Sequence, residues 1–389
     1  MGNFIVYAQL DSFFVLQDLA FKYGAADGIE IRNTRQMQLL DCDLSYIGGT
    51  ELNPQQRYGG GIQFWAYSNN NTVERCRFWE IYDDAVTNQC TPSNPGPAQQ
   101  YNIFYRNNVI WNCSESSYCC DLRPATLTGS FLKNIYFENN TCVNAGGGWA
   151  AAQRPDPKGF QIYFSAITAP TDSIFIRNNV FYKSRAVLFV DNSSVQTLNY
   201  TDIDYNDWYV RNSNDTIAAL WTSSSLTVWT KAQFANYQVT NNEDLHSIMA
   251  DPLLADTLTR DYHLTSASPC RSAGINNGVP TDFDLNPRPL SGPYDIGAYQ
   301  YVSGTGLNPL NFDPQLHIYP VPSKDIFYFD GLRRGYTIEV YNTLGERVYS
   351  AEAESDKYAI SLRGQSRGMY IYKVSDNTTT IQQGKIIVE

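Results

Sequence analysis

The chain has 389 residues, with 28 Lys and Arg against 39 Asp and Glu, so its formal net charge at pH 7 is −11. The length exceeds the usual size of one compact domain, and the aromatic-rich composition favours β architecture in two domains. The negative charge argues against nucleic acid as a partner. No apolar run is long enough to span a bilayer, so we expect no transmembrane segment.

A repeat runs through the first two thirds of the chain. Segments such as LLDCDLSY, IFYRNNVIWN and IFIRNNVFYK align on one position, and its occupants recur 27 to 39 residues apart. They are Cys42, Cys76, Asn108, Asn140, Asn179 and Asn206. A short strand cannot bury its inner face alone and must stack on copies of itself, so this spacing predicts the rungs of a solenoid. Inward-facing Asn residues at equivalent turns then form a hydrogen-bonded ladder, a structural role.

The rungs, over residues 4–235, resemble the right-handed parallel β-helix superfamily of pectate lyases, polygalacturonases and alginate epimerases. The resemblance implies a protein that acts on polysaccharide or binds it. We expect function in the long loops inserted between rungs, at 44–60, 91–100, 114–131 and 143–158, because stacked strands form a rigid support for them.

Candidate substrate-binding residues lie in these loops or next to them. Aromatic rings beside Arg or Lys suit the faces, hydroxyls and carboxylates of sugars, although the same side chains also serve to cover loop cores. The candidates are Tyr58, Arg123, Trp149, Arg154, Lys158 and Tyr163.

The candidate catalytic residues are Asp83 and Asp84, with Asp121 one rung later as a partner across a cleft. Two neighbouring carboxylates push each other's pKa apart, which glycosidic cleavage needs. Polygalacturonases also carry an Asp-Asp pair on such a rung, but their Gly-His-Gly and Arg-x-Lys motifs are absent here, so that activity is not carried over. Solvated turn aspartates are the alternative.

The histidines and the net charge bear on the type of chemistry. His246, His263 and His317 all lie beyond the repeats, which disfavours a lyase or epimerase that uses His. A lyase with Arg, Lys or Tyr as base and a cation such as Ca²⁺ on a uronate stays open, but no cofactor is implied with certainty. The negative charge makes neutral polysaccharide the easier substrate, unless Ca²⁺ or a local basic cluster compensates.

The eight cysteines are too sparse in a chain of this length to require a disulfide framework. Cys90, Cys119 and Cys120 stand in loop-like sequence, and a disulfide from Cys90 to Cys119 or Cys120 is a candidate in an oxidising compartment.

Residues 240–301 resemble the closing segment of many secreted bacterial β-helix proteins, with DPL, DYHL, SPC-x-SAG and DIGAYQY in order. We expect this segment to cap the open end of the solenoid, which completes a first domain over residues 1–301. Residues 302–315 are rich in Gly, Pro and Asn and predict a linker.

Residues 316–389 read as alternating strands of a small Ig-like β-sandwich. YPVPSKD, YNTLGERV, LRGQSRGMYIYKV and the terminal GKIIVE are similar to the C-terminal sorting domain of type IX secretion substrates in the Bacteroidota. The resemblance implies export by that machinery, removal of the domain by a surface sortase, and a secreted or cell-surface location on a Gram-negative bacterium. Export needs a signal peptide, which the opening MGNFIVYAQL does not resemble, so we expect the natural gene product to carry one.

The expected fold class is therefore all-β, a right-handed parallel β-helix solenoid followed by a small C-terminal β-sandwich. Two functions stay open. One is a carbohydrate-active enzyme, a polysaccharide hydrolase before a lyase. The other is a non-catalytic surface adhesin or glycan-binding solenoid.

Overall fold

The computed structural model describes residues 4–53, 56–90, 96–122, 128–154, 158–210, 212–222, 224–302, 316–342, 345–376 and 380–389. The chain divides into two compact units, residues 1–302 and 303–389, which are described separately. The expected linker 302–315 lies outside the described residues except for Val302.

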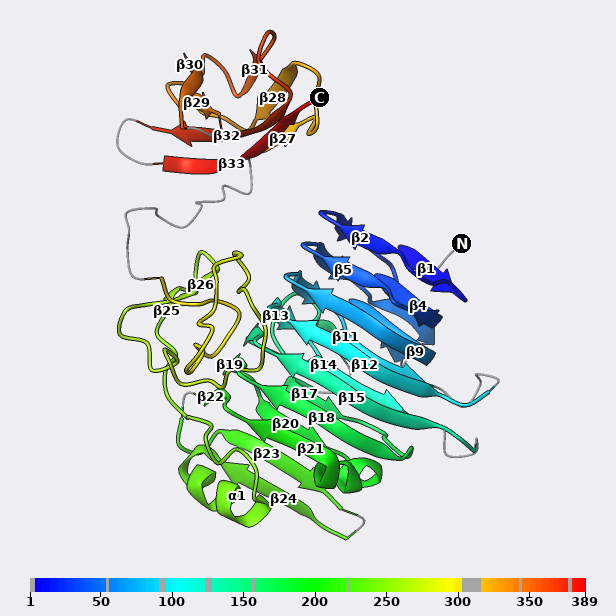
Figure 1. The fold of residues 1–389 in the computed structure, drawn as a ribbon. Coiled ribbons are helices and arrows are strands. Elements are labelled where there is room, and N and C mark those ends of the chain that lie inside the picture. The colour runs from blue at the N-terminus through cyan, green and yellow to red at the C-terminus, as the bar shows by residue number, and fades with distance from the viewer. Residues whose placement is uncertain are drawn as a thin grey trace. The chain divides into compact units, whose positions relative to one another are not determined.

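The first unit is a stack of rungs whose strands pair in parallel along three faces (Figure 1). Face A contains β1 (Val6–Gln9), β4 (Ile29–Arg35), the first part of β9 (Ile62–Glu74), β11 (Asp84–Cys90), β14 (Ser116–Leu122), β17 (Phe160–Phe164), β20 (Ala186–Val190) and β23 (Thr216–Trp221). Face B contains β2 (Val15–Gln17), β5 (Gln38–Leu40), the second part of β9, β12 (Gln99–Arg106), β15 (Phe131–Glu138), β18 (Thr171–Arg177) and β21 (Thr201–Asp204).

Face C forms a separate seven-stranded sheet. It contains β3 (Ala20–Lys22), β6 (Asp43–Ile47), β10 (Arg77–Ile81), β13 (Val109–Cys113), β16 (Thr141–Val143), β19 (Val180–Tyr182) and β22 (Asp207–Tyr209). Because each rung visits the faces in the order A, B and C, residues one rung apart in sequence become direct neighbours. A short antiparallel hairpin, β7 (Thr50–Asn53) and β8 (Gln56–Tyr58), is inserted between β6 and β9.

The core follows from the in-register stacking. Ile62, Val86, Tyr118, Ile162 and Leu188 occupy one inward position on five successive rungs of face A, and all five are fully buried. Burying a large apolar side chain contributes roughly 1.5–3 kcal/mol, so each added rung extends one continuous core.

The aligned position found in the sequence is the corner between faces B and C, as predicted. The Nδ2 atoms of Asn108, Asn140 and Asn179 each lie 3.0 Å from the Oδ1 atom of the next asparagine in the column, which ends at Asn206. The same Oδ1 atoms accept a backbone N–H at 2.9 Å. The inward amides, which are fully buried, therefore satisfy one another and the turn backbone.

The end of the solenoid after β23 is covered mainly by residues before the closing segment. β24 (Leu226–Thr230) pairs antiparallel with β23, and η3 (Lys231–Gln233) leads into α1 (Phe234–Asn241). The Tyr237 ring lies 5.4 Å from Trp208 in the last rung, and α1 stands at that end in Figure 1. Only the first part of the closing segment joins this end, where Ile248 bonds to the backbone of Asn206.

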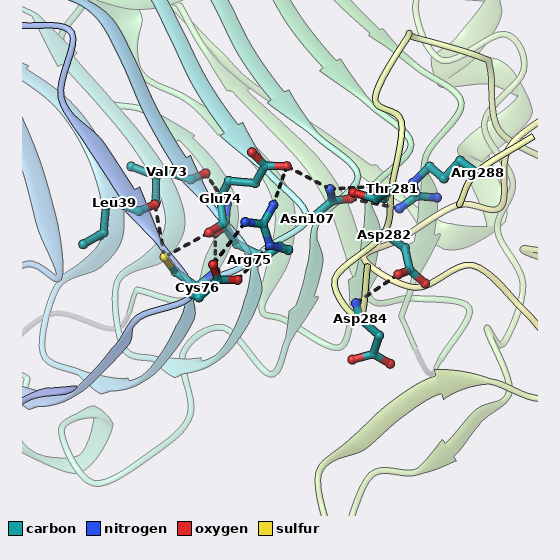
Figure 2. A network of polar contacts seen from close by, with 12 residues as sticks. Leu39, Val73, Glu74, Arg75, Cys76, Asn107, Thr281, Asp282, Asp284 and Arg288 are labelled. Atoms are coloured by element: carbon teal, nitrogen blue, oxygen red, sulfur yellow. Dashed lines mark hydrogen bonds and ion pairs between the residues drawn. The ribbon is translucent and has the colours of Figure 1, made fainter. Parts of the chain in front are cut away.

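Most of the closing segment instead lies on the outer surface of face C, so the expectation that it caps the open end is corrected for residues beyond 250. β25 (Leu254–Asp256) and β26 (Asp261–Leu264) form a hairpin, and Tyr262 packs with Trp111 and Val180 of face C. Figure 2 shows the polar part of the contact, in which Asn107 donates to the Thr281 carbonyl at 2.9 Å and accepts from Arg288 at 3.0 Å. The apolar outer positions of face C explain this placement, because they need a cover.

The second unit consists of two antiparallel sheets around a common core. One contains β27 (His317–Tyr319), β28 (Ile326–Asp330) and β31 (Lys357–Ser361); the other contains β30 (Arg347–Glu352), β29 (Thr337–Tyr341), β32 (Gly368–Ser375) and β33 (Thr380–Val388). Phe327 and Phe329 from the first sheet and Val340 and Val374 from the second are fully buried in one cluster. The predicted small β domain is confirmed.

Candidate functional site

The candidate site begins where the chain enters face A at β11. The backbone N–H of Asp83 donates to the Gly59 carbonyl at 3.0 Å, the N–H of Glu115 to the Asp83 carbonyl at 3.2 Å, and the N–H of Gly159 to the Glu115 carbonyl at 3.1 Å. These four residues form one column along successive rungs. Glu115 therefore lies next to Asp83 because the rung spacing places it there.

Arg154 of the 143–158 loop bridges the two acids. Its Nη1 lies 2.5 Å from Asp83 Oδ1 and its Nη2 lies 2.6 Å from Glu115 Oε2, and Nη1 also donates to the Tyr82 carbonyl at 2.9 Å. The Arg154 side chain is 7% exposed, against 15% for Asp83 and 14% for Glu115. Because one guanidinium contacts both carboxylates, they face the same side of the strands, and their ion pairs are shielded from bulk water.

Lys158 and Tyr163 extend the cluster along β17. Lys158 Nζ lies 2.9 Å from Glu115 Oε1 and 3.2 Å from the Tyr163 hydroxyl, and it stands 4.6 Å from the centre of the Tyr163 ring. Although burial lowers the pKa of Lys158, the Glu115 carboxylate and Tyr163 raise it by more, so the net shift is upward. Lys158 therefore stays a cation held against Glu115.

Asp83 and Asp84 both have raised pKa values in this setting. Burial, reinforced by the charge of Glu115, raises the pKa of Asp83 to about 7 against the opposing pull of Arg154. Burial also raises the pKa of Asp84 well above its usual range, with Glu115 and Asp83 adding to the shift. The Asp84 carboxylate accepts a hydrogen bond from the Ser116 hydroxyl at 2.6 Å. A protonated carboxyl beside an ion-paired carboxylate is an arrangement that supports general acid and base chemistry near neutral pH.

A second acidic cluster lies on face A towards the N-terminus. Asp27 Oδ1 accepts from the Gly60 backbone at 2.7 Å and from the Gln63 side chain at 2.8 Å, and burial raises its pKa to about 7. Burial, together with the charges of Asp27 and Glu30, raises the pKa of Tyr58. Tyr58 therefore belongs with these acids rather than with the Arg154 bridge.

The other candidates from the sequence lie apart from the bridge. Trp149 is anchored to β10, with its backbone N–H 2.7 Å from Glu80 Oε2 and its indole N–H 3.0 Å from the Glu80 carbonyl, and 37% of its surface stays exposed. Asp121 pairs in register with Gln89, five residues beyond Ser116 and thus about 16 Å further along the strand. Glu115, not Asp121, is the neighbour of Asp83. Arg123 lies outside the described residues.

Glu115 and Asp27 are the acids that the sequence reasoning missed. A signal for Glu115 was present, because it follows Asp83 by 32 residues, the same spacing that separates Cys76 from Asn108. Asp27 stands two residues before β4, outside the segments aligned on the ladder position.

The cysteine expectation is corrected. Cys119 and Cys120 are buried free thiols within strand β14, opposite Thr87 and Asn88 of β11. The backbone of Cys90 instead pairs with Leu122. Because adjacent strand residues point to opposite surfaces of face A, Cys119 and Cys120 point in opposite directions from β14. Both are free thiols, so neither forms the expected disulfide with Cys90.

Within the part of the chain that the structure describes, no three His, Cys, Asp or Glu side chains are grouped so as to hold a metal ion. Nor does any described helix have the length and apolar character needed to cross a membrane.

Comparison with known proteins places both units. Residues 2–167 match the family described as the right handed beta helix region, and residues 317–389 match the secretion system C-terminal sorting domain. A search of curated proteins gives no match. A solved structure titled "Glycoside hydrolase" is similar at 10% sequence identity with a TM-score of 0.29, over 51% of this chain and 38% of that one. A likeness at this level carries no argument about activity.

The chain is thus a right-handed parallel β-helix protein with a C-terminal type IX secretion sorting domain. It is a secreted or cell-surface protein that engages the secretion machinery through residues 317–389.

Proposed function

We propose that this protein is a polysaccharide hydrolase whose reacting groups are Asp83 and Glu115. The observation that carries the proposal is the Arg154 bridge, which holds a carboxyl with a pKa of about 7 beside a second, ion-paired carboxylate. Glycosidic cleavage needs such a pair, about 5 to 10 Å apart when substrate is bound, and two groups that share one guanidinium lie within reach of that spacing.

In this mechanism Asp83 carries the proton. It protonates the glycosidic oxygen as the bond to the leaving sugar breaks, and Glu115 either attacks the anomeric carbon or activates a water. Arg154 and Lys158 both pair with Glu115, whereas Asp83 is the carboxyl whose pKa is raised to about 7, so Asp83 is assigned as the proton donor. Burial raises the pKa of Asp84 well above its usual range, so Asp84 is a neutral neighbour of the pair near pH 7. The Tyr163 ring, Tyr58 near the second acidic cluster and Trp149 beside β10 are proposed to contact sugar rings.

The test is a panel of polysaccharides assayed for new reducing ends and for the absorbance of unsaturated uronates. Asp83→Asn and Glu115→Gln keep the shapes of the side chains, and Asp172→Asn on face B, where the acid is 55% exposed, is the matched control. We expect reducing ends without absorbance, a rate loss of roughly 10²–10⁴-fold in the two site variants, and no loss in the control. Equal rates in all four proteins contradict the assignment, and absorbance indicates a lyase.

One observation favours a non-catalytic alternative. Arg154 also bonds to the Tyr82 carbonyl and so fixes the 143–158 loop to the solenoid, a structural role for the same acids. In a glycan-binding adhesin, the panel yields binding without any cleavage, and Asp83→Asn lowers thermal stability without changing affinity.

We also propose that a surface sortase of a Bacteroidota host removes the C-terminal unit after export and that the β-helix is attached to the cell surface. The observation behind this is the compact, separate fold of residues 316–389. Mass spectrometry of the surface form is expected to show a chain that ends near residue 315. An intact C-terminus at Glu389 on the surface contradicts the cut.

A further inference from the structure

Glu80 belongs to a column of face C residues that share a left-handed backbone. Tyr46, Glu80, Asn112, Asn144 and Lys183 stand at equivalent positions of five successive rungs, and each has a φ between 54° and 58°. Residues other than glycine seldom adopt this conformation, and asparagine adopts it more readily than glutamate. The contacts of the Glu80 side chain explain why a glutamate occupies this position.

The Glu80 carboxylate joins the asparagines of this column to the 143–158 loop. Asn144 donates to Asn112 and Asn112 donates to Glu80 Oε1, both at 2.7 Å. The other oxygen, Oε2, accepts the backbone N–H of Trp149 at 2.7 Å, and the Glu80 carbonyl accepts the indole N–H at 3.0 Å. Glu80 is only 8% exposed, so these hydrogen bonds are shielded from water. An asparagine at position 80 is one methylene shorter and loses the reach to Trp149.

Gly148 shows how closely the loop approaches this carboxylate. A Cβ atom at Gly148 would lie 2.5 Å from Glu80 Oε2 and 2.8 Å from the Asn112 carbonyl, and the φ of Gly148 is 84°. Glycine alone suits both the space and the backbone. The Trp149 ring lies against Gly49, where an added Cβ would stand 3.3 Å from it. The loop is therefore fixed to the solenoid at residues 148 and 149.

A short structured segment connects this anchor to Arg154. Arg154 follows Trp149 by five residues, and the 3₁₀ helix η1 (Ala151–Gln153) occupies three of the positions between them. The Gln153 side chain accepts a hydrogen bond from Arg57 of β8 at 3.0 Å. Because the connection is short and folded, a displacement of Trp149 moves the guanidinium of Arg154 as well.

We propose that Glu80 is a positioning residue for the candidate site, because its hold on Trp149 keeps Arg154 in place. Arg154 in turn contacts both Asp83 and Glu115. The inference rests on the proposed function, in which Asp83 is the proton donor. Arg154 opposes the rise in the pKa of Asp83, so releasing the guanidinium raises that pKa further. Glu80 thus sets the pH range in which Asp83 is protonated, although it lies on face C and outside the acidic pair.

Two neutral substitutions that differ by one methylene test this. Glu80→Asn suits the left-handed backbone and keeps an acceptor for Asn112, but loses the reach to Trp149. Glu80→Gln keeps that reach and is the matched control. Hydrogen–deuterium exchange of the 148–154 amides reports on the loop, and a ¹³C NMR titration of the aspartate-labelled full chain reports the pKa of Asp83, assigned with Asp83→Asn. Relative to Glu80→Gln, we expect exchange at least about tenfold faster in Glu80→Asn and a pKa of Asp83 higher by roughly half a pH unit or more.

Gly148→Ala is a second variant, because its methyl group displaces the loop from Glu80 without altering the solenoid. We expect it to give the same two changes as Glu80→Asn. Equal exchange in Glu80→Asn and Glu80→Gln overturns the inference, because Glu80 then does not hold the loop. Faster exchange with an unchanged pKa of Asp83 also overturns it, because the loop then moves without Arg154.

The experiment uses no substrate, so its failure and that of the proposed function are distinguishable. A polysaccharide panel without cleavage contradicts the hydrolase and leaves the exchange and titration results unaffected. Where reducing ends are released, the fall in rate with pH is expected at a higher pH in Glu80→Asn than in Glu80→Gln, a change that a purely structural role of Glu80 does not produce.

Discussion

Two columns of polar side chains run along the same solenoid, and they differ in how their hydrogen-bonding and charged groups are satisfied. At the corner between faces B and C, Asn108, Asn140 and Asn179 satisfy one another through amide groups that both donate and accept. At the start of face A, stacking brings Asp83 next to Glu115, and two carboxylates cannot satisfy each other. The same rung spacing thus builds a ladder of amides that satisfy one another and a pair of carboxylates that takes its counter-charge from Arg154 and Lys158.

The acidic pair depends on a distant segment, whereas the ladder does not. Arg154, 71 residues after Asp83 in sequence, supplies the counter-charge from the 143–158 loop. This difference indicates where chemistry is possible on a repeat fold. A column whose side chains hydrogen-bond to one another has a structural role. A column of carboxylates that needs a cation from another segment contains groups whose protonation can change.

Removing the Arg154 guanidinium is expected to have the largest effect on stability. Arg154→Met leaves Asp83 buried without its cation and Glu115 with Lys158 alone, and we expect a loss of about 3–5 kcal/mol in the free energy of unfolding at neutral pH, measured by urea denaturation. Adding Asp83→Asn and Glu115→Gln to this variant removes the unpaired charges and is expected to recover at least half of the loss. No recovery means that Arg154 stabilises the fold by packing alone.

Interrupting the asparagine ladder is expected to lower the free energy of unfolding by somewhat less. Asn140→Ala removes the amide that donates to the Tyr105 carbonyl and accepts from the Asn108 backbone, both at 2.9–3.0 Å, and we expect a loss of about 2–3 kcal/mol. The outer asparagine Asn102 is the control, since its amide donates to Asn70 and accepts from Asn134 at a more exposed position, and its φ of 52° is one that glycine tolerates. Asn102→Gly is expected to cost less than about 1 kcal/mol. Equal losses at the two positions contradict the distinction between inner and outer columns.

The sequence predicted much of the solenoid because its physics is local to each rung. The Asn-Asn turns and alternating strands identify the ladder, and the terminal motifs identify the sorting domain. Asp83 and Asp84 were also found, since the doublet is visible in the chain. Glu115 was missed because the alignment followed the ladder corner, and loops of varying length hide the register of face A.

Other features depend on tertiary contacts that no local pattern reveals. The closing segment covers face C through contacts such as Arg288 with Asn107, which are 181 residues apart. Its sequence specifies apolar strands but not the surface that they cover.

The pH dependence of cleavage tests the central claim most directly. Asp83 must be protonated to act as the acid, and its pKa in the folded protein is about 7, so the rate of reducing-end release is expected to fall about tenfold for each pH unit well above 7. The same raised pKa means that the folded state holds a proton that the unfolded state releases near pH 4, so the stability due to Asp83 declines as pH rises from about 4 to 7. The measurement is the initial rate on the best substrate from pH 5 to pH 9. A fall centred near pH 7 that is absent from the residual activity of Asp83→Asn supports the account, and a rate that stays level to pH 9 contradicts it.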